Sequence, residues 1–393
     1  MHSHIKGRTK ILDTAYRLGG SLGCPMEYAP ARQVKRRWYH LPHLLVSVSS
    51  PQGIPRLNNF DVLRLLFASM VVLAHCHDLS MEPLLSWVPR IVNSRLAVEG
   101  FFAMSGCLIV ASYDRSSSLA SYLGKRARRI IPAYMVALIV ALFLGMTLTT
   151  LTLSEFCLSP KTWEYILAHL VLATHLQPTL PGLFSHNPFQ SSVNGALWTI
   201  KIEVLFYVCV PAIVALCRKL GTLQTLGVLF CASSIYRTVC DHFHWDNLAV
   251  QLPGQLSFFV MGALVYYYFP FFKKHGRWMW SAAACGYFAY FATGFVGFRA
   301  VGLSLMVMCV AFLMPHFEGP TKYGDFSYGA YVLHCPIIQT LIALGVFHAH
   351  PLLAVVLVVV LVAFVSIASW NLVEKPFLNM RWRSKVLPTE VAG

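Results

Sequence analysis

The sequence contains few charged residues. Asp, Glu, Lys and Arg make up 12% of its 393 residues, whereas 56% are hydrophobic. Soluble domains average about 25% charged residues. Between residues 60 and 373, no polar stretch is long enough to form a soluble domain. The composition therefore excludes an ordinary soluble protein and predicts an all-α, polytopic membrane protein.

Acidic residues and paired cysteines are also scarce. The 31 Lys and Arg outnumber the 16 Asp and Glu, which gives a net charge of +15. This excess does not indicate nucleic-acid binding, because the basic residues lie at helix boundaries, where their retention on the cytoplasmic side explains them. The eleven cysteines form no CxxC pair. Because His242 and His244 alone supply too few ligands, we expect no metal site.

The first 55 residues lack the apolar core of a signal peptide and form a basic segment that contains Pro and Gly. We therefore expect residues 1–56 to be a cytoplasmic tail without ordered structure. Residues 57–376 are expected to form the transmembrane domain, and residues 377–393 a second cytoplasmic tail. Met26 is an alternative start of the chain.

Apolar stretches of nearly membrane-spanning length recur along the chain and predict about ten transmembrane helices. The segment 163–176 is not counted, because it has only 14 residues and contains Glu164, His169 and His175. We expect it to be a partly inserted or surface helix. The predicted spans are 60–79, 96–114, 131–151, 197–217, 220–237, 252–271, 278–297, 300–317, 327–347 and 351–373.

Ten spans with both termini in the cytoplasm place 25 of the 31 Lys and Arg on the cytoplasmic side, five outside and one within the membrane. This asymmetry supports the orientation. Two segments, 152–196 and 238–251, then lie outside. Their aromatic and carboxylate side chains suit sugar binding, although ordinary solvated loops explain them equally well.

Three polar residues interrupt the first span, FDVLRLLFASMVVLAH. Because 11 residues of α-helix complete three turns plus about 20°, Arg64 and His75 lie on one face. Asp61 lies one turn before Arg64 and is predicted to pair with it, and Asn58 is a candidate helix cap. His75 is expected near the middle of the membrane or slightly beyond it.

Polar residues on further spans predict a shared internal cavity, because an uncompensated polar group in hydrocarbon costs several kcal/mol. A neutral imidazole can take a proton from a hydroxyl and return it to a leaving group, and a neighbouring carboxylate would hold its tautomer. His75 and His334 are the two candidates. Glu203 and Tyr207 are neighbours at i and i+4. The other polar residues expected in this cavity are Glu99, Ser105, Lys201, Ser327 and Tyr331.

A basic cluster in YLGKRARRIIPAY directly precedes Pro132 and the third span. Most such clusters anchor a helix to anionic headgroups. Here Lys125, Arg126, Arg128 and Arg129 adjoin an expected helix start, which also resembles a binding site for a phosphorylated donor. Both interpretations remain open at the level of the sequence.

Six motifs occur in one order over residues 60–376: FDVLRLLFASMVVLAH, EGFFAMSG, KRARRIIPAY, LWTIKIEVLFY, SYGAYVLH and EKP. Together they resemble the integral-membrane acyltransferase family three, which includes O-acetyltransferases of O-antigen, exopolysaccharide and peptidoglycan. The resemblance implies a multi-pass enzyme of the bacterial cytoplasmic (inner) membrane. Such an enzyme transfers an acyl group, usually acetyl, from cytoplasmic acyl-CoA (acetyl-CoA) to a hydroxyl of an extracytoplasmic carbohydrate.

The resemblance also assigns roles by position. His75 is the expected catalytic residue, and Glu203 or Glu99 the expected orienting partner. Trp198 and Tyr207 are expected to contact the acceptor. Gly324 and Asp325 depart from the family pattern, because they precede the ninth span without a strong anchor. The residues expected to contact the coenzyme are Arg64, Lys125, Arg126, Arg128, Arg129, Ser327, Tyr331 and His334.

Alternatives remain for both function and mechanism. His75 either deprotonates the acceptor hydroxyl or carries the acyl group itself. A transporter or flippase would also bury Arg, Glu and His, although the sequence has no internal repeat. A non-catalytic partner in polysaccharide assembly is the third possibility. The acyl group, the acceptor and the oligomeric state are not specified by the sequence.

Overall fold

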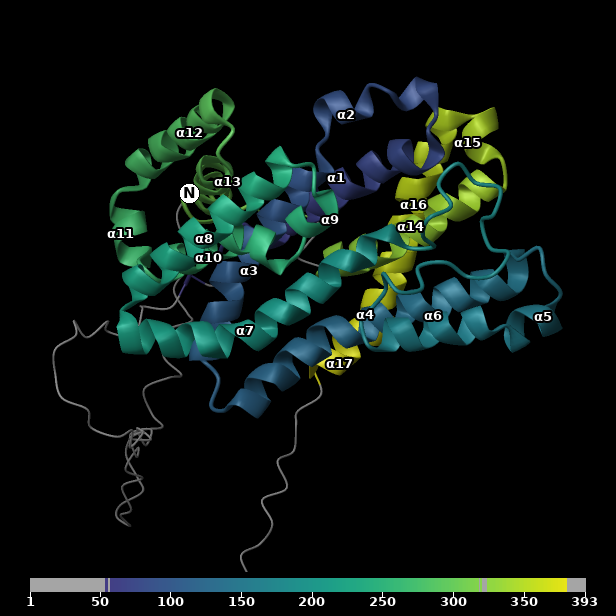
Figure 1. The fold of residues 1–393 in the computed structure, drawn as a ribbon, viewed down its shortest axis with the longest axis horizontal. Coiled ribbons are helices and arrows are strands. Elements are labelled where there is room, and N and C mark those ends of the chain that lie inside the picture. Colours follow the sequence, from purple (N-terminus) through teal and green to yellow (C-terminus); the bar gives the residue numbers. More distant parts are fainter. Residues whose placement is uncertain (1–53, 56, 318, 320–323, 380–393) are drawn as a thin grey trace, which may run out of the picture. The chain divides into compact units, whose positions relative to one another are not determined.

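The structure is a computed structural model that describes residues 54–55, 57–317, 319 and 324–379. In these ranges the secondary structure is entirely helical (Figure 1). All of these described residues belong to one compact unit. The predicted N-terminal tail lies outside the described ranges except for residues 54–55, and the predicted C-terminal tail is described only to residue 379.

Every predicted span corresponds to a helix. Within the described ranges, six helical segments are long and apolar enough to cross a membrane, and they contain α1, α3, α4, α7, α10 and α16. The all-helical membrane architecture is thus confirmed, whereas the count of ten spans and the placement of the termini stay predictions. The ten helices are α1 (Phe60–Ser80), α3 (Ser94–Asp114), α4 (Leu119–Leu148), α7 (Trp198–Leu220), α8 (Thr222–His242), α10 (Leu252–Tyr267), α12 (Gly276–Thr293), α13 (Val296–Phe312), α14 (Ser327–Ala343) and α16 (Pro351–Ser369).

Short helices connect the long ones. The segment 163–176 falls mostly on α6, which has 11 residues and is too short to span a bilayer. The short elements are η1 (Pro83–Leu85), α2 (Val88–Ile91), α5 (Leu153–Leu158), α6 (Pro160–Leu170), η2 (Gly195–Leu197), α9 (Asp246–Ala249), α11 (Phe269–Lys274), α15 (Val346–Ala349), the π-helix η4 (Trp370–Glu374) and α17 (Lys375–Asn379).

Helix α4 departs most from its predicted bounds. The sequence predicts the third span from residue 131, but α4 begins at Leu119 and continues to Leu148 with Pro132 inside it. Ser118 caps this earlier start by accepting a hydrogen bond from the amide of Ser121 at 3.1 Å. The basic cluster 125–129 therefore lies on a helix, and its side chains point to different sides because successive residues are turned by about 100°.

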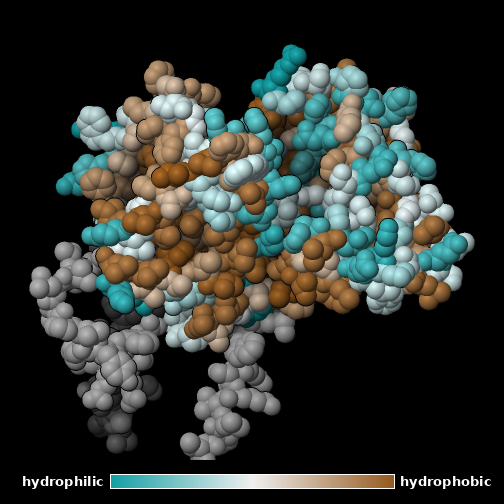
Figure 2. All heavy atoms as spheres, in the orientation of Figure 1, coloured by the Kyte–Doolittle hydropathy of each residue, from teal (hydrophilic) through white to brown (hydrophobic). Residues whose placement is uncertain are grey.

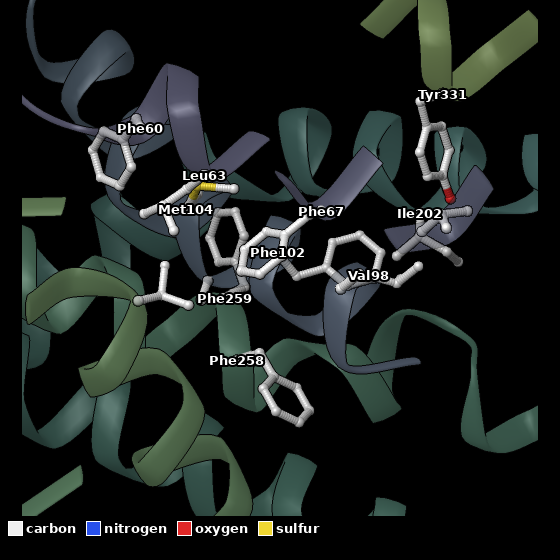
Figure 3. Close-up of a cluster of buried hydrophobic side chains, with 14 of the residues drawn as sticks. Phe60, Leu63, Phe67, Val98, Phe102, Met104, Ile202, Phe258, Phe259 and Tyr331 are labelled. Carbon is white, nitrogen blue, oxygen red and sulfur yellow. The ribbon is translucent and has the colours of Figure 1, made fainter. Parts of the chain in front are cut away.

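Close contact between α3 and α10 forms the centre of the core. A Cβ atom on Gly106 would lie 1.8 Å from the carbonyl oxygen of Phe259, and one on Gly262 would lie 1.9 Å from that of Ala103. Aromatic rings fill the space beside this contact (Figure 3), and Phe206 of α7 stacks on Phe259 with 4.2 Å between ring centroids. Glycine is required at both positions, because any side chain would separate the helices.

Large apolar side chains are exposed on the outer helices. Phe288 and Phe291 of α12 are 78% and 80% exposed, and Phe364 of α16 is 70% exposed. Figure 2 shows hydrophobic side chains over much of the visible surface. Monomeric soluble proteins rarely expose apolar patches on this scale, whereas contact with lipid requires them. The protein is a membrane protein.

Helix α14 packs against both α1 and α16. The long segment 152–196 is tied to α14 by side-chain hydrogen bonds: the amide nitrogen of Asn187 donates to Oε1 of Gln339 at 2.6 Å, and that of Asn194 donates to the carbonyl of Val332 at 2.8 Å. The packing of α14 on α1 brings together the two predicted intramembrane histidines.

Candidate active site

Two histidines from opposite ends of the chain form a hydrogen-bonded pair. His75 lies on α1 and His334 on α14, and their rings stack with 5.0 Å between centroids. Nδ1 of His75 lies 2.7 Å from Nε2 of His334. His334 is fully buried, whereas His75 is partly exposed. The sequence identified both residues but assigned His334 to the coenzyme rather than to His75.

The backbone of α14 determines where the protons of this pair lie. Nδ1 of His334 lies 3.1 Å from the carbonyl oxygen of Ala330. A carbonyl only accepts, so this nitrogen carries the proton. In the neutral pair, Nε2 of His334 then accepts a hydrogen bond from Nδ1 of His75. His75 is left with its lone pair on Nε2, which is the basic atom that the pair presents to a substrate.

A thiol adjoins the histidine pair. Sγ of Cys335 lies 3.5 Å from Nδ1 of His75 and 3.4 Å from Nε2 of His334. The side chain is buried at 1% exposure. No spacing pattern in the sequence indicated this contact, because it depends on how α1 and α14 are packed together.

His75 borders a cavity of about 250 Å³, which we call the histidine cavity. Trp198 lines it, as do Asp246 of α9 and Gln255 of α10. Oε1 of Gln255 is buried and has no hydrogen-bond partner among the described residues. An aromatic face, a carboxylate and an unsatisfied amide oxygen are groups that suit a hydroxyl-rich ligand.

A second cavity, which we call the basic cavity, has a volume of about 110 Å³. Arg64, Arg126 and Arg129 line it together with apolar residues that include Phe101 and Phe102. Within the described part of the chain, the buried Nε of Arg126 has no hydrogen-bond partner. Guanidinium groups with an unsatisfied N–H suit a phosphate-bearing ligand. This cavity therefore fits the acyl donor that the family resemblance implies.

Asp325 holds two of these guanidinium groups in place. Its carboxylate accepts hydrogen bonds from Arg129, from Ser327 and, at 3.4 Å, from Arg64. Burial alone would raise the pKa of the Asp325 carboxyl, but Arg129 and Arg64 outweigh burial and lower it below its ordinary value. The expectation that Asp325 lacks a strong anchor is therefore wrong. The predicted Asp61–Arg64 pair is confirmed at 2.5 Å.

Glu203 and Tyr207 lie at the basic cavity rather than beside His75. The Tyr207 hydroxyl donates to Oε1 of Glu203 at 2.5 Å, which confirms that they are neighbours. The guanidinium of Arg126 lies 5.7 Å from the centroid of the Tyr207 ring. The sequence predicted a carboxylate beside His75, but His334 lies there instead. Tyr207 lines the basic cavity, whereas Trp198, which was also predicted to contact the acyl acceptor, lines the histidine cavity.

The basic cluster divides between two environments. Arg126 and Arg129 line the basic cavity. Lys125 instead donates to Oγ of Ser116 at 3.1 Å, and Nε of Arg128 donates to the carbonyl of Gly124 at 3.1 Å. Neither of these two side chains is part of the cavity lining, as expected when the cluster lies on a helix rather than in one loop.

Glu99 borders the histidine cavity within a network of ion pairs. Its carboxylate lies 2.6 Å from Nη2 of Arg299, 3.6 Å from Nε of Arg95 and 3.7 Å from Nη2 of Arg237. Arg237 is fully buried and also pairs with Asp241. These arginines belong to the five Lys and Arg predicted outside the membrane, and they engage Glu99 in ion pairs rather than leaving it to orient His75. Burying them without such pairing would be costly.

Val98 and Tyr331 line both cavities, so the two spaces share part of a wall. The Tyr331 hydroxyl projects from α14 toward α7 (Figure 3) and accepts a hydrogen bond from Thr199 at 2.9 Å. Ser327 lines the basic cavity one turn before Tyr331. His75 is thus not in the same space as the basic cluster, but one wall separates them.

The fold and site define a membrane protein whose oriented histidine pair adjoins a guanidinium-lined cavity, an arrangement suited to acid-base catalysis of group transfer from an anionic donor. A sequence profile described as acyltransferase domain matches residues 57–371. The chain belongs to the integral-membrane acyltransferase family three, and the protein is an acyltransferase.

Curated relatives agree with this family. The chain is 30% identical over 354 residues to nodulation protein 10 of Rhizobium leguminosarum biovar viciae, with 82% of this chain and 94% of that protein covered. It is 27% identical to an O-acetyl transferase of Shigella phage Sf6 (82% and 96% covered) and 27% identical to the exopolysaccharide production protein ExoZ of Rhizobium meliloti (75% and 93% covered). No solved structure matches the chain significantly.

Proposed function

We propose that the protein is an O-acyltransferase that moves an acyl group, in the first instance acetyl, from cytoplasmic acyl-CoA to a hydroxyl of an extracytoplasmic carbohydrate such as exopolysaccharide or O-antigen. The observation that carries the proposal is the 2.7 Å contact between Nδ1 of His75 and Nε2 of His334, which assigns the lone pair of His75 to Nε2, at a cavity that shares a wall with the guanidinium-lined one. The names of the phage and ExoZ relatives support the ester linkage and the polysaccharide acceptor.

The basic cavity binds the donor in this proposal. Arg126 and Arg129 contact the phosphates of the coenzyme, and the apolar wall at Phe101 and Phe102 covers the arm that bears the thioester. Asp325 holds Arg64 and Arg129 at this cavity, which faces the cytoplasm if both termini are cytoplasmic. The thioester supplies the activated acyl group, and Tyr331 and Val98 mark where it reaches the histidine cavity.

His75 acts as the general base. Nε2 takes the proton of the acceptor hydroxyl as its oxygen attacks the thioester carbonyl, and the same nitrogen then gives the proton to the departing thiolate. His334 positions His75 by accepting from Nδ1, which keeps the lone pair on Nε2 and stabilises the imidazolium that forms. In the alternative route, Nε2 attacks the thioester itself and His75 carries the acyl group until the hydroxyl displaces it.

The histidine cavity receives the acceptor and opens to the outer side of the cytoplasmic (inner) membrane. The Trp198 ring offers a face for a sugar, and Oε1 of Gln255 is available to accept from a hydroxyl. Glu99 and its arginines act as a rigid, ion-paired wall rather than as a catalytic acid. In this proposal the acyl donor and the acceptor meet at the wall that the two cavities share, at Val98 and Tyr331, so neither has to cross the bilayer.

A deletion strain complemented with wild type or His75→Ala tests this function. Mass spectrometry of the surface glycans is expected to show ester groups with wild type and none with either the deletion or the variant. Unchanged esters together with altered glycan export would favour a transporter, and esters restored by His75→Ala would favour a non-catalytic partner. Acetyl-CoA labelled in its acyl group separates the two routes, because label retained on wild type but not on His75→Ala indicates the covalent one.

A further inference from the structure

The two histidines and the adjoining Cys335 together match the ligand set of a transition metal. Nδ1 of His75, Nε2 of His334 and Sγ of Cys335 lie within 4.8 Å of one another. Imidazole nitrogen and thiolate sulfur are ligands that favour Zn²⁺ among the common divalent cations. Within the described residues, this is the one group of three or more such side chains close enough to share an ion.

The spacing of these atoms is close to that of a tetrahedral site. With zinc bonds of about 2.3 Å to sulfur and 2.05 Å to nitrogen, tetrahedral angles place sulfur about 3.6 Å from each nitrogen. The two sulfur–nitrogen distances here are 3.5 and 3.4 Å. Only the 2.7 Å separation of the two nitrogens must widen, by about 0.7 Å, as the ion replaces the shared proton.

The surroundings also resemble those of a metal site. The second nitrogen of His334 donates to the carbonyl of Ala330, and histidines that bind metals usually donate in this way to a backbone carbonyl or carboxylate. His75 borders the histidine cavity, which provides a route for the ion and room for a fourth ligand such as water.

We propose that His75, His334 and Cys335 form an inhibitory site for Zn²⁺ that switches off the histidine pair. Binding releases one proton, that of the Cys335 thiol, to solvent. His75 keeps its proton but moves it from Nδ1 to Nε2, because Nδ1 now bonds the metal. The lone pair on Nε2 is thereby lost, and His75 no longer accepts a proton from a hydroxyl. The ion is a competitor of the catalytic tautomer and not a resident cofactor.

Metal binding does not depend on the proposed function, whereas the loss of acyl-transfer activity rests on it. The two are therefore measured separately. Full-length protein purified in detergent is titrated with Co²⁺, which reports thiolate coordination through a sulfur-to-metal charge-transfer band. We expect the band in wild type and in Cys309→Ser, which alters a buried cysteine of α13. We expect no band in Cys335→Ser or in Cys335→Ala. A band that persists in both Cys335 variants would overturn the site.

Acyl transfer is then measured from labelled acetyl-CoA with increasing Zn²⁺. Wild type and Cys309→Ser are expected to lose activity and to regain it with chelator, whereas the Cys335 variants should need at least about tenfold more Zn²⁺, since even outer-shell losses cost this much affinity. Equal inhibition of all variants would overturn the switch. A wild type that shows the cobalt band but never transfers acyl groups would refute the proposed function and leave the metal site intact.

Discussion

Replacement of His334 tests whether it positions His75 rather than contacting the coenzyme. In His334→Leu, Nδ1 of His75 loses the acceptor that lies 2.7 Å away. In His334→Gln, the side-chain amide oxygen can take the place of Nε2 and accept the same hydrogen bond. The two variants have similar volumes, so they differ mainly in whether an acceptor is present.

The expected size of the effect follows from the charge that develops on His75. A hydrogen bond to a charged group contributes about 1.5 to 3 kcal/mol. Because each 1.36 kcal/mol corresponds to a tenfold change in rate, loss of this bond in the transition state lowers kcat about 10- to 160-fold. Neither histidine lines the basic cavity, so the KM for acetyl-CoA should stay nearly constant in both variants.

The assay follows the initial rate at which label passes from acetyl-CoA into polysaccharide in membranes that contain equal amounts of each variant. We expect His334→Leu to show the full loss in kcat and His334→Gln to stay within a few-fold of wild type. If both variants were equally impaired, or if KM rose while kcat was unchanged, His334 would not act through its acceptor nitrogen. The assignment to the coenzyme would then be the better one.

Three further outcomes follow from the structure. Arg126→Gln should raise the KM for acetyl-CoA about tenfold or more, whereas Lys125→Gln should leave it unchanged, because of these two residues only Arg126 lines the basic cavity. Equal KM values for the two variants would contradict the donor site. Asp325→Asn should destabilise the protein by about 3 kcal/mol at neutral pH. Since the folded-state pKa of this carboxyl is lowered, the difference from wild type should shrink as the pH falls below about 4; thermal melts at several pH values would reveal a constant difference if the reasoning is wrong. Gly106→Val should abolish stable expression, because its Cβ would lie 1.8 Å from a carbonyl oxygen of α10; a wild-type melting temperature would contradict the close helix contact.

The sequence predicted what depends on local periodicity. Apolar runs located each long helix, and the i, i+3 and i, i+4 spacings correctly predicted Asp61 beside Arg64 and Glu203 beside Tyr207. The start of α4 was missed, because an amphipathic helical turn rich in Lys and Arg looks like a loop when only hydropathy is considered. The cap at Ser118 was the available signal.

Contacts between helices could not be predicted from one sequence. His75 and His334 are separated by 259 positions, and no spacing rule indicates that α1 packs on α14. For the same reason the carboxylate of Glu99 was expected beside His75, whereas packing of α8 and α13 surrounds it with Arg237 and Arg299. The anchoring role of Asp325 was missed because both of its arginines come from other helices.

The most direct test of the account is the rate at which purified protein releases free coenzyme A from acetyl-CoA in the presence of polysaccharide acceptor, compared between wild type and His75→Ala. With its general base removed, the variant is predicted to be at least about 100-fold slower at saturating donor, while it binds acetyl-CoA as tightly as wild type. A variant that releases coenzyme A at the wild-type rate would contradict the claim that the imidazole of His75 performs the proton transfer.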